Sequence, residues 1–506
     1  MSLILVDGLK DRPGTGGPKF PNGLHLPAGI GITGDGHINM AGVCTFSGNV
    51  TIGGTLTYED VTNIDSVGII TANTGINVVA NGINVQAGIL TAKNIIDASD
   101  AQYNTRVGTN AGNSFSGTNA TYNTLIGYEA GTAITTGDYN TALGGRDTLK
   151  ATTTGSYNVA LGNYTLSSNT TSGNNTAVGY AALNNNTAAS NTAVGHQALL
   201  ANTTGTRNVA VGYNALDANT TGGNNTSIGY LALTDNTTGA YNTALGDAAL
   251  GNNTTADNNT AVGYAALNLN TAAGNSAFGA TALDANTTGA ANQAFGYAAL
   301  GANTTGQYNC AFGHSALAAN TTSDSNTAVG YLALTANTTG NSNVAVGLEA
   351  LETNTTGVRN TALGMRALEA NSTGEENTAV GTGALYANTT ASYNVAVGQN
   401  ALVQNTTGEK NTGLGQDSLY SNTTGNRNVA VGRIALYTNS TGHYNTALGQ
   451  GAMYYNNADS NTSIGYESMN ANTTGTQNVA VGAYALDANT TTNSNTAVGY
   501  NALSAN

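Results

Sequence analysis

The sequence predicts a mainly β fold, an elongated parallel β-solenoid built from repeats of about 16–17 residues. One unit recurs from Asn104 to Asn495, giving 24 copies. In every copy the fourth residue is Val, Ile, Leu or Phe and the fifth is Gly. Such an array buries apolar surface only between neighbouring units, so it grows by adding layers to one long body.

The repeat is numbered here from its leading asparagine. The copy that begins at Asn208 reads NVAVGYNALDANTTGGN, and the next reads NTSIGYLALTDNTTGAY. Most copies have this length. Two of the first four are slightly longer, whereas those that begin at Asn175, Asn259 and Asn445 are one residue shorter. The fixed phase of Val, Leu and Ala between Asn, Thr and Gly argues against disorder, despite the polar composition.

The first five positions of each repeat predict a short β-strand that ends at a glycine able to adopt positive φ. Stacked copies would place position 4 of each layer about 4.8 Å from position 4 of the last. Position 9, usually Leu, supplies a second apolar point. We therefore predict core ladders at positions 4 and 9, with turn glycines at position 5: Val178, Val194, Val211, Ile228, Leu245, Val262, Phe278, Phe295, Phe312, Leu183, Leu199 and Leu216, with Gly179, Gly195, Gly212 and Gly229. The three phenylalanines would stack in successive layers.

Positions 6–11 are rich in Ala, Leu, Glu and Arg, which favours one helical turn over a second strand. Asn-Thr-Thr-Gly then closes the repeat as a turn. Stacked Asn and Thr side chains are expected to hydrogen-bond to their equivalents in adjacent layers. The same letters match the N-glycosylation sequon, for example at Asn202. Because the chain shows no secretory signal, the structural interpretation is preferred.

The composition excludes several function classes. The net charge is −14 and only 8% of residues are charged, without the Lys/Arg clusters that nucleic acid requires. The N-terminus lacks the basic start and following apolar stretch that are typical of a signal peptide. No apolar run reaches the roughly 18 residues of a membrane span. Cys44 and Cys310 lie in different regions and suggest neither a disulfide nor a metal site.

No catalytic, metal or cofactor motif stands out. Residues 29–34 match the dinucleotide fingerprint by letter, but no βαβ pattern surrounds them. The five histidines lack metal-ligand spacing, and His196 and His314 replace the tyrosine common at position 6. No Ser or Cys nucleophile has a signature around it, so we expect no enzyme. Tyrosines at position 6 and at the last position of the repeat could bind sugars or could cover apolar edges between layers. Packing between layers is the favoured interpretation.

Three regions follow from the pattern. Residues 1–44 contain all four prolines and are predicted to be an irregular N-terminal anchor. Residues 45–103 carry regularly spaced Gly-Ile pairs and predict a narrow β shaft. Residues 104–506 form the array, whose last repeat is incomplete. Because solenoids normally need capped ends, we expect that another protein covers Asn506 or that a further domain was removed.

A single chain offers little apolar surface. One Val, one Leu and a few Ala in each repeat bury little area against the conformational entropy of ordering about 17 residues. We therefore expect a parallel homotrimer with a shared axial core. If each chain coils on itself, 24 layers span roughly 115 Å, whereas three interleaved chains would span roughly 350 Å.

The repeat Asn-Thr-Ala-Val-Gly-Tyr-x-Ala-Leu-x-x-Asn-Thr-Thr-Gly resembles repeats in bacteriophage tail fibres. It is also similar to the head repeats of trimeric autotransporter adhesins, and the segment from Gly54 to Ala72 looks like structural proteins of cyanobacterial myophages. The phage resemblance implies a trimeric virion fibre made in the host cytoplasm. It would be held at its N-terminus by a baseplate or tail protein and would project toward a host receptor or glycan.

Two alternatives to the phage fibre stay open. A bacterial trimeric surface adhesin would need a signal peptide and a membrane anchor, and the sequence offers neither. A solenoid whose threonine ranks recognise ice or glycan belongs to a different function class, and flanking asparagines make it less favoured. Many phage fibres carry a C-terminal self-cleaving chaperone, but its residues are not found in this sequence.

Overall fold

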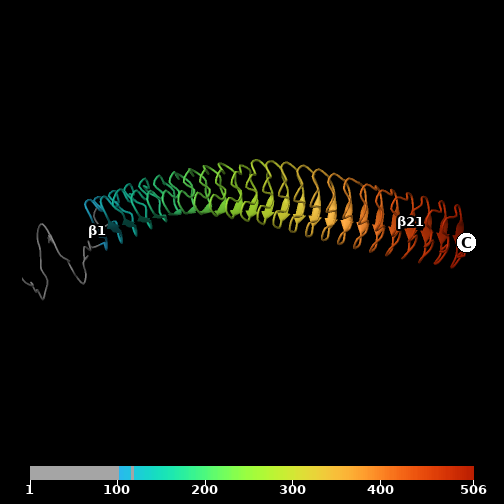
Figure 1. The fold of residues 1–506 in the computed structure, drawn as a ribbon. Helices are drawn as coiled ribbons and strands as arrows, with labels where there is room; N and C mark the ends of the chain where they lie inside the picture. The colour runs from blue at the N-terminus through green and yellow to red at the C-terminus, as the bar shows by residue number, and fades with distance from the viewer. Residues whose placement is uncertain (1–101, 116–118, 506) are drawn as a thin grey trace, which may run out of the picture. The chain divides into compact units, whose positions relative to one another are not determined.

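The computed structural model describes residues 102–115 and 119–505, and this part of the chain is a parallel β-solenoid (Figure 1). Each repeat forms one layer with one three-residue strand, and no helix occurs among the described residues. The predicted solenoid is confirmed. The predicted anchor at 1–44 and all but the last two residues of the predicted shaft at 45–103 lie outside the described residues.

The 24 strands occupy repeat positions 2–4 throughout. Their bounds are β1 Thr105–Val107, β2 Thr124–Ile126, β3 Thr141–Leu143, β4 Val159–Leu161, β5 Thr176–Val178, β6 Thr192–Val194, β7 Val209–Val211, β8 Thr226–Ile228, β9 Thr243–Leu245, β10 Thr260–Val262, β11 Ser276–Phe278, β12 Gln293–Phe295, β13 Cys310–Phe312, β14 Thr327–Val329, β15 Val344–Val346, β16 Thr361–Leu363, β17 Thr378–Val380, β18 Val395–Val397, β19 Thr412–Leu414, β20 Val429–Val431, β21 Thr446–Leu448, β22 Thr462–Ile464, β23 Val479–Val481 and β24 Thr496–Val498.

Consecutive strands pair in parallel, with equivalent positions aligned. Val178 of β5 pairs with Val194 of β6, and Phe278 of β11 pairs with Phe295 of β12. Since β1 pairs with β2 and the same step continues to β24, the chain coils on itself. Of the two geometries that the sequence allowed, the described structure has the self-coiled one.

The inner face of the strand wall is lined by position 3, not by position 4. Ala177, Ala210 and Ala294 are fully buried, whereas Leu245 is 44% and Phe312 is 41% exposed. Successive side chains of a strand point to opposite faces, so positions 2 and 4 share the outer face when position 3 points inward. The prediction that position 4 lines the core is therefore corrected for Val178, Val194, Val211, Ile228, Leu245, Val262, Phe278, Phe295 and Phe312.

The glycine at position 5 turns the chain out of the strand. Gly179, Gly195, Gly212 and Gly229 have φ of 125°, 142°, 141° and 146°, a region that side chains rarely allow. A Cβ on Gly296 would lie 2.3 Å from the carbonyl oxygen of Gly313 in the next layer. Glycine is required at this corner both by the backbone conformation and by the close stacking of layers.

The predicted helical turn at positions 6–11 is absent. Positions 7 and 9 instead have left-handed backbone conformations, as at Asn214 (φ 49°) and Leu216 (φ 56°). The Leu216 N–H donates to the Ala232 carbonyl in the next layer at 3.0 Å, and the Asn214 N–H donates to the His196 carbonyl in the previous layer at 3.0 Å. Helix propensity is overridden because these amides find partners between layers rather than within one turn.

Two columns of asparagine complete the interior, and both are fully buried along most of their length. At position 12, the Asn219 Nδ2 donates to Asn202 Oδ1 at 2.8 Å and to the Gly222 carbonyl at 3.0 Å. At position 1, the Asn208 N–H donates to Asn191 Oδ1 at 2.9 Å. The sequon residue Asn202 is thus part of a buried ladder, which supports the structural interpretation of Asn-Thr-Thr.

The three shortened repeats, which begin at Asn175, Asn259 and Asn445, interrupt the position-12 ladder. Asn270 Nδ2 donates to the Ala272 carbonyl of its own repeat at 2.7 Å instead of reaching the preceding Asn253. Asn253 Oδ1 accordingly has no hydrogen-bond partner among the described residues. The Oδ1 atoms of the asparagines that precede the other two shortened repeats are also without one; these are Asn169 and Asn439. Strand register is unaffected, since Val262 still pairs with Phe278.

Candidate functional site

The outer face of the sheet carries an uninterrupted apolar column, named here the outer stripe and formed by position 4 of β1–β24. Position 2, on the same face, is Thr in most strands and never a charged residue. The predicted residues of position 4 therefore come together on the surface. The predicted residues of position 9 lie elsewhere, because Leu183, Leu199 and Leu216 are fully buried in the opposite wall.

Three phenylalanines form the bulkiest part of the outer stripe. The ring centres of Phe278 and Phe295 are 4.6 Å apart, and those of Phe295 and Phe312 are 4.3 Å apart, with 8° between ring planes in both pairs. This is the stack that the sequence predicted. Cys310 lies beside it at repeat position 2, the first residue of β13, and burial raises the pKa of its thiol, which disfavours the reactive thiolate.

Aromatic side chains also form columns on other faces. Tyr180, His196, Tyr213 and Tyr230 stack at position 6, with ring centres 5.1–5.4 Å apart. Because neighbouring rings cover one another's faces, such a column presents mainly ring edges and hydroxyl groups. This geometry supports packing between layers, the interpretation favoured from the sequence.

The strongest acidic cluster among the described residues is occupied by an arginine. Carboxylate oxygens of Glu349, Glu352 and Glu369 lie within 4.8 Å of one another, close enough to hold a cation. The Arg366 guanidinium pairs with Glu349 at 3.3 Å and also with Glu369. Burial, and then the charges of the other two glutamates, raise the pKa of Glu352. The cluster is therefore an ion-pair network across layers and not an open ligand set.

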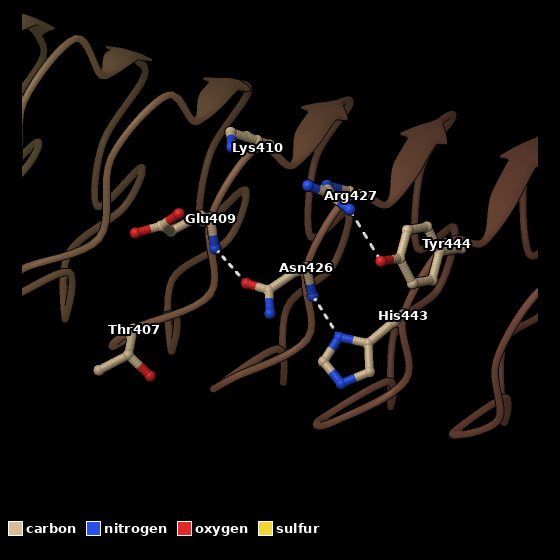
Figure 2. A pocket seen from close by; sticks show the side chains of 7 residues that line it. All are labelled: Thr407, Glu409, Lys410, Asn426, Arg427, His443 and Tyr444. Atoms are coloured by element: carbon tan, nitrogen blue, oxygen red, sulfur yellow. Dashed lines mark hydrogen bonds between the residues drawn. The ribbon is translucent and has the colours of Figure 1, made fainter.

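A shallow hollow with a volume of about 480 Å³ lies on the corner that leads into β19–β21. Figure 2 shows its side chains in two rows that run along the array. One row has Lys410, Arg427 and Tyr444 at position 17, and the other has Glu409, Asn426 and His443 at position 16; Thr407 completes the lining. Because repeats stack in register, residues one repeat apart in the sequence become neighbours.

Neither cation of this hollow makes an ion pair with any residue that the structure describes. The Lys410 ammonium lies 5.7 Å from the ring centre of Tyr393, in the preceding layer. The Arg427 guanidinium lies 5.4 Å from the ring centre of Tyr444, and its Nη1 donates to the Tyr444 hydroxyl at 2.8 Å. The sequence holds a signal for this site that was not used for the predictions: Tyr, Lys, Arg and Tyr occupy one repeat position in four successive copies.

No family model matches the chain, and neither a curated protein nor a solved structure matches it. Within the described ranges, no helix is long and apolar enough to cross a membrane.

Proposed function

We propose that residues 104–506 form the rigid stalk of a phage virion fibre, a parallel homotrimer that holds a host-binding surface away from the particle. The observation that carries this proposal is the continuous strand pairing from β1 to β24, which gives one stiff body rather than a string of domains. At about 4.8 Å per layer, the array spans roughly 110 Å. The repeat resemblance to tail fibres supports the virion setting.

The outer stripe supports the trimer. Soluble monomers rarely expose a contiguous apolar patch above a few hundred Å². Here one residue in each of 24 layers contributes, and many of these side chains are more than a third exposed. A partner must match the layer spacing along the whole stripe, and a second copy of this chain in parallel orientation has the same spacing. Three copies would then bury the stripe along a common axis.

Light scattering on the full chain tests the assembly. The chain mass is 50.6 kDa, so a trimer has roughly three times that mass. Replacing Phe278, Phe295 and Phe312 by aspartate is expected to give monomers, since three charges would enter the shared apolar core. The matched control replaces Tyr420, Tyr437 and Tyr454 by serine, because these rings stack in three successive layers at position 10. A monomeric unmodified chain would overturn the trimer.

Electron microscopy with antibody against the repeats tests the virion setting. Label along fibres of phage particles is the expected result. Label confined to a bacterial envelope, with none on particles, would overturn the phage assignment and favour the surface adhesin. The attachment partner at the N-terminus and the host receptor would be sought on the same particles.

A further inference from the structure

The hollow at Lys410 and Arg427 differs from the rest of its column. Arg359 occupies the same repeat position three layers earlier, but it pairs with Glu376 at 2.8 Å and also with Glu375. Arg207, at the same position, has Ser190 and Asn224 as its column neighbours, neither of which carries a ring. In the column as the structure describes it, two unpaired cations adjoin only at layers 18 and 19, in a chain whose net charge is −14.

The two cations are held in place without being neutralised. Tyr393 lies before Lys410 and Tyr444 lies after Arg427, so the rings bracket the pair along the column. A ring face attracts a cation and restricts its position, but it carries no charge to cancel. Lys410 and Arg427 are one layer apart, about 4.8 Å along the array, so both can face one ligand.

The neighbouring row supplies neutral hydrogen-bonding groups. The Asn426 N–H donates to His443 Nδ1 at 3.0 Å, so this nitrogen is unprotonated and the neutral ring carries its hydrogen on Nε2. The Glu409 N–H donates to Asn426 Oδ1, which fixes the amide with its Nδ2 as the remaining donor group. Figure 2 shows these side chains beside the cation row, with the Glu409 carboxylate at the far edge.

We propose that this hollow binds an acidic oligosaccharide whose carboxylate groups pair with Lys410 and Arg427 while its hydroxyl groups bond to the Asn426 and His443 row. A guanidinium fork matches a carboxylate in two-point geometry, and neutral amide and imidazole donors suit sugar hydroxyls. Nucleic acid is disfavoured, because the chain is acidic overall and the Tyr393 and Tyr444 faces are covered by the cations.

This site deepens the proposed attachment role by giving the host ligand a chemical class. Lys410 and Arg427 lie four residues before Leu414 and Val431 of the outer stripe and two residues before their strands begin. The hollow and the outer stripe thus consist of different residues. Binding is measurable on the purified full chain, so a failure to bind would leave the stalk proposal standing, and a bacterial location would leave the binding intact.

Titration calorimetry with tetragalacturonic acid as the probe and maltotetraose as the neutral reference tests the proposal. We expect tetragalacturonate to bind and maltotetraose to bind at least about tenfold more weakly, since each charge-assisted contact contributes about a factor of ten. The double variant K410Q/R427Q is expected to lose tetragalacturonate binding by about tenfold or more. E409Q should strengthen it, because a like charge leaves the hollow.

Two matched variants serve as controls. R359Q removes an ion-paired cation and R207Q removes an unbracketed one, both from the same repeat position, and neither should change the affinity. Higher salt should weaken tetragalacturonate binding because the pairs are exposed. Equal binding of both sugars, unchanged affinity in K410Q/R427Q, or tighter binding of a DNA tetranucleotide than of tetragalacturonate would each overturn the proposal.

Discussion

The long uninterrupted stretch from Asn270 to Asn439 and the three shortened repeats share one strand wall but differ at the asparagine corner. In the long stretch, Asn303 Nδ2 donates to Asn286 Oδ1 at 2.7 Å, and Asn303 Oδ1 accepts from Asn320 at 2.8 Å. At the shortened repeat from Asn259, this step is missing. Strand pairing continues across both regions in the same register.

The difference indicates that the strand wall and the asparagine corner of a layer are held by separate sets of hydrogen bonds. A residue lost after position 12 breaks the side-chain ladder, yet the backbone ladder of the strands carries on. The asparagine corner therefore adds stability to layers whose stacking the strands already define. Because solenoids open locally rather than all at once, hydrogen exchange can measure the stability of the strand wall and of the asparagine corner layer by layer.

The largest effect is expected at the glycine corner, and it should be equal in both regions. In Gly296→Ala the new Cβ meets the Gly313 carbonyl, and Gly263→Ala, in the shortened repeat, meets Gly279 at 2.5 Å. Overpacking and the unfavourable φ together cost about 4 kcal/mol of local stability. A much smaller cost at Gly263 than at Gly296 would mean that the shortened repeat relaxes the strand wall as well.

The next effect distinguishes the two regions directly. Asn303→Ala removes donors to two oxygens and an acceptor for Asn320, so we expect a loss of about 3 kcal/mol in the surrounding layers. Asn253→Ala removes donors only, to Asn236 and Ala256, and is expected to cost about 1 kcal/mol less. Equal losses would contradict the conclusion that the ladder ends at Asn253.

Restoring the residue that the repeat from Asn259 lacks should raise the local stability instead of lowering it. One glycine inserted between Ala272 and Ala273 returns that repeat to the usual length and allows Asn270 to reach Asn253. We expect about 1–2 kcal/mol of added protection in the two adjoining layers, because a buried oxygen gains a partner. As a control, the same insertion after Gly306 makes a repeat one residue longer than usual, and its layers should lose protection.

The smallest effect is the pH dependence of stability at Asp284, in the wall opposite the strands. Burial raises the pKa of the Asp284 carboxyl, so its contribution to stability is complete below the ordinary carboxyl pKa and is lost as pH rises through the raised value. The shortened repeat already has a neutral residue, Asn268, at this position. Asp284→Asn should therefore add less than about 1 kcal/mol at pH 7, and the gain should disappear in acid. A gain that is independent of pH would argue against the carboxylate as its cause.

Much of the architecture could be predicted from the repeat alone. The period, a short strand within the first five positions, the glycine corner and the phenylalanine stack all follow from residues at fixed phase. Orientation of the strand was predicted wrongly because Val and Phe at position 4 were assigned to the core by hydrophobicity. The narrow interior admits only small residues, mostly alanine, from the strand wall along most of the array, so the larger apolar residue faces outward.

The conformation of positions 6–11 and the cation site were missed for different reasons. Ala, Leu and Glu at positions 6–11 favour a helix locally, but hydrogen bonds to adjacent layers impose the alternating left-handed conformation. The row of Lys410 and Arg427 becomes visible only when copies are aligned and the unpaired charges are identified. Burial of the polar asparagine at position 12 likewise depends on hydrogen bonds to adjacent layers, which a single repeat does not show.

The distance between spin labels on β9 and β17 tests the central claim that consecutive repeats of one chain stack on each other. Cysteines would replace Thr243 and Thr378, with Cys44 and Cys310 changed to serine and labelled chains diluted in unlabelled ones. Eight layer spacings separate the two strands, so we predict about 38 Å between the label sites. A separation near three times that value, as interleaved chains require, or a broad distribution of distances would contradict the account.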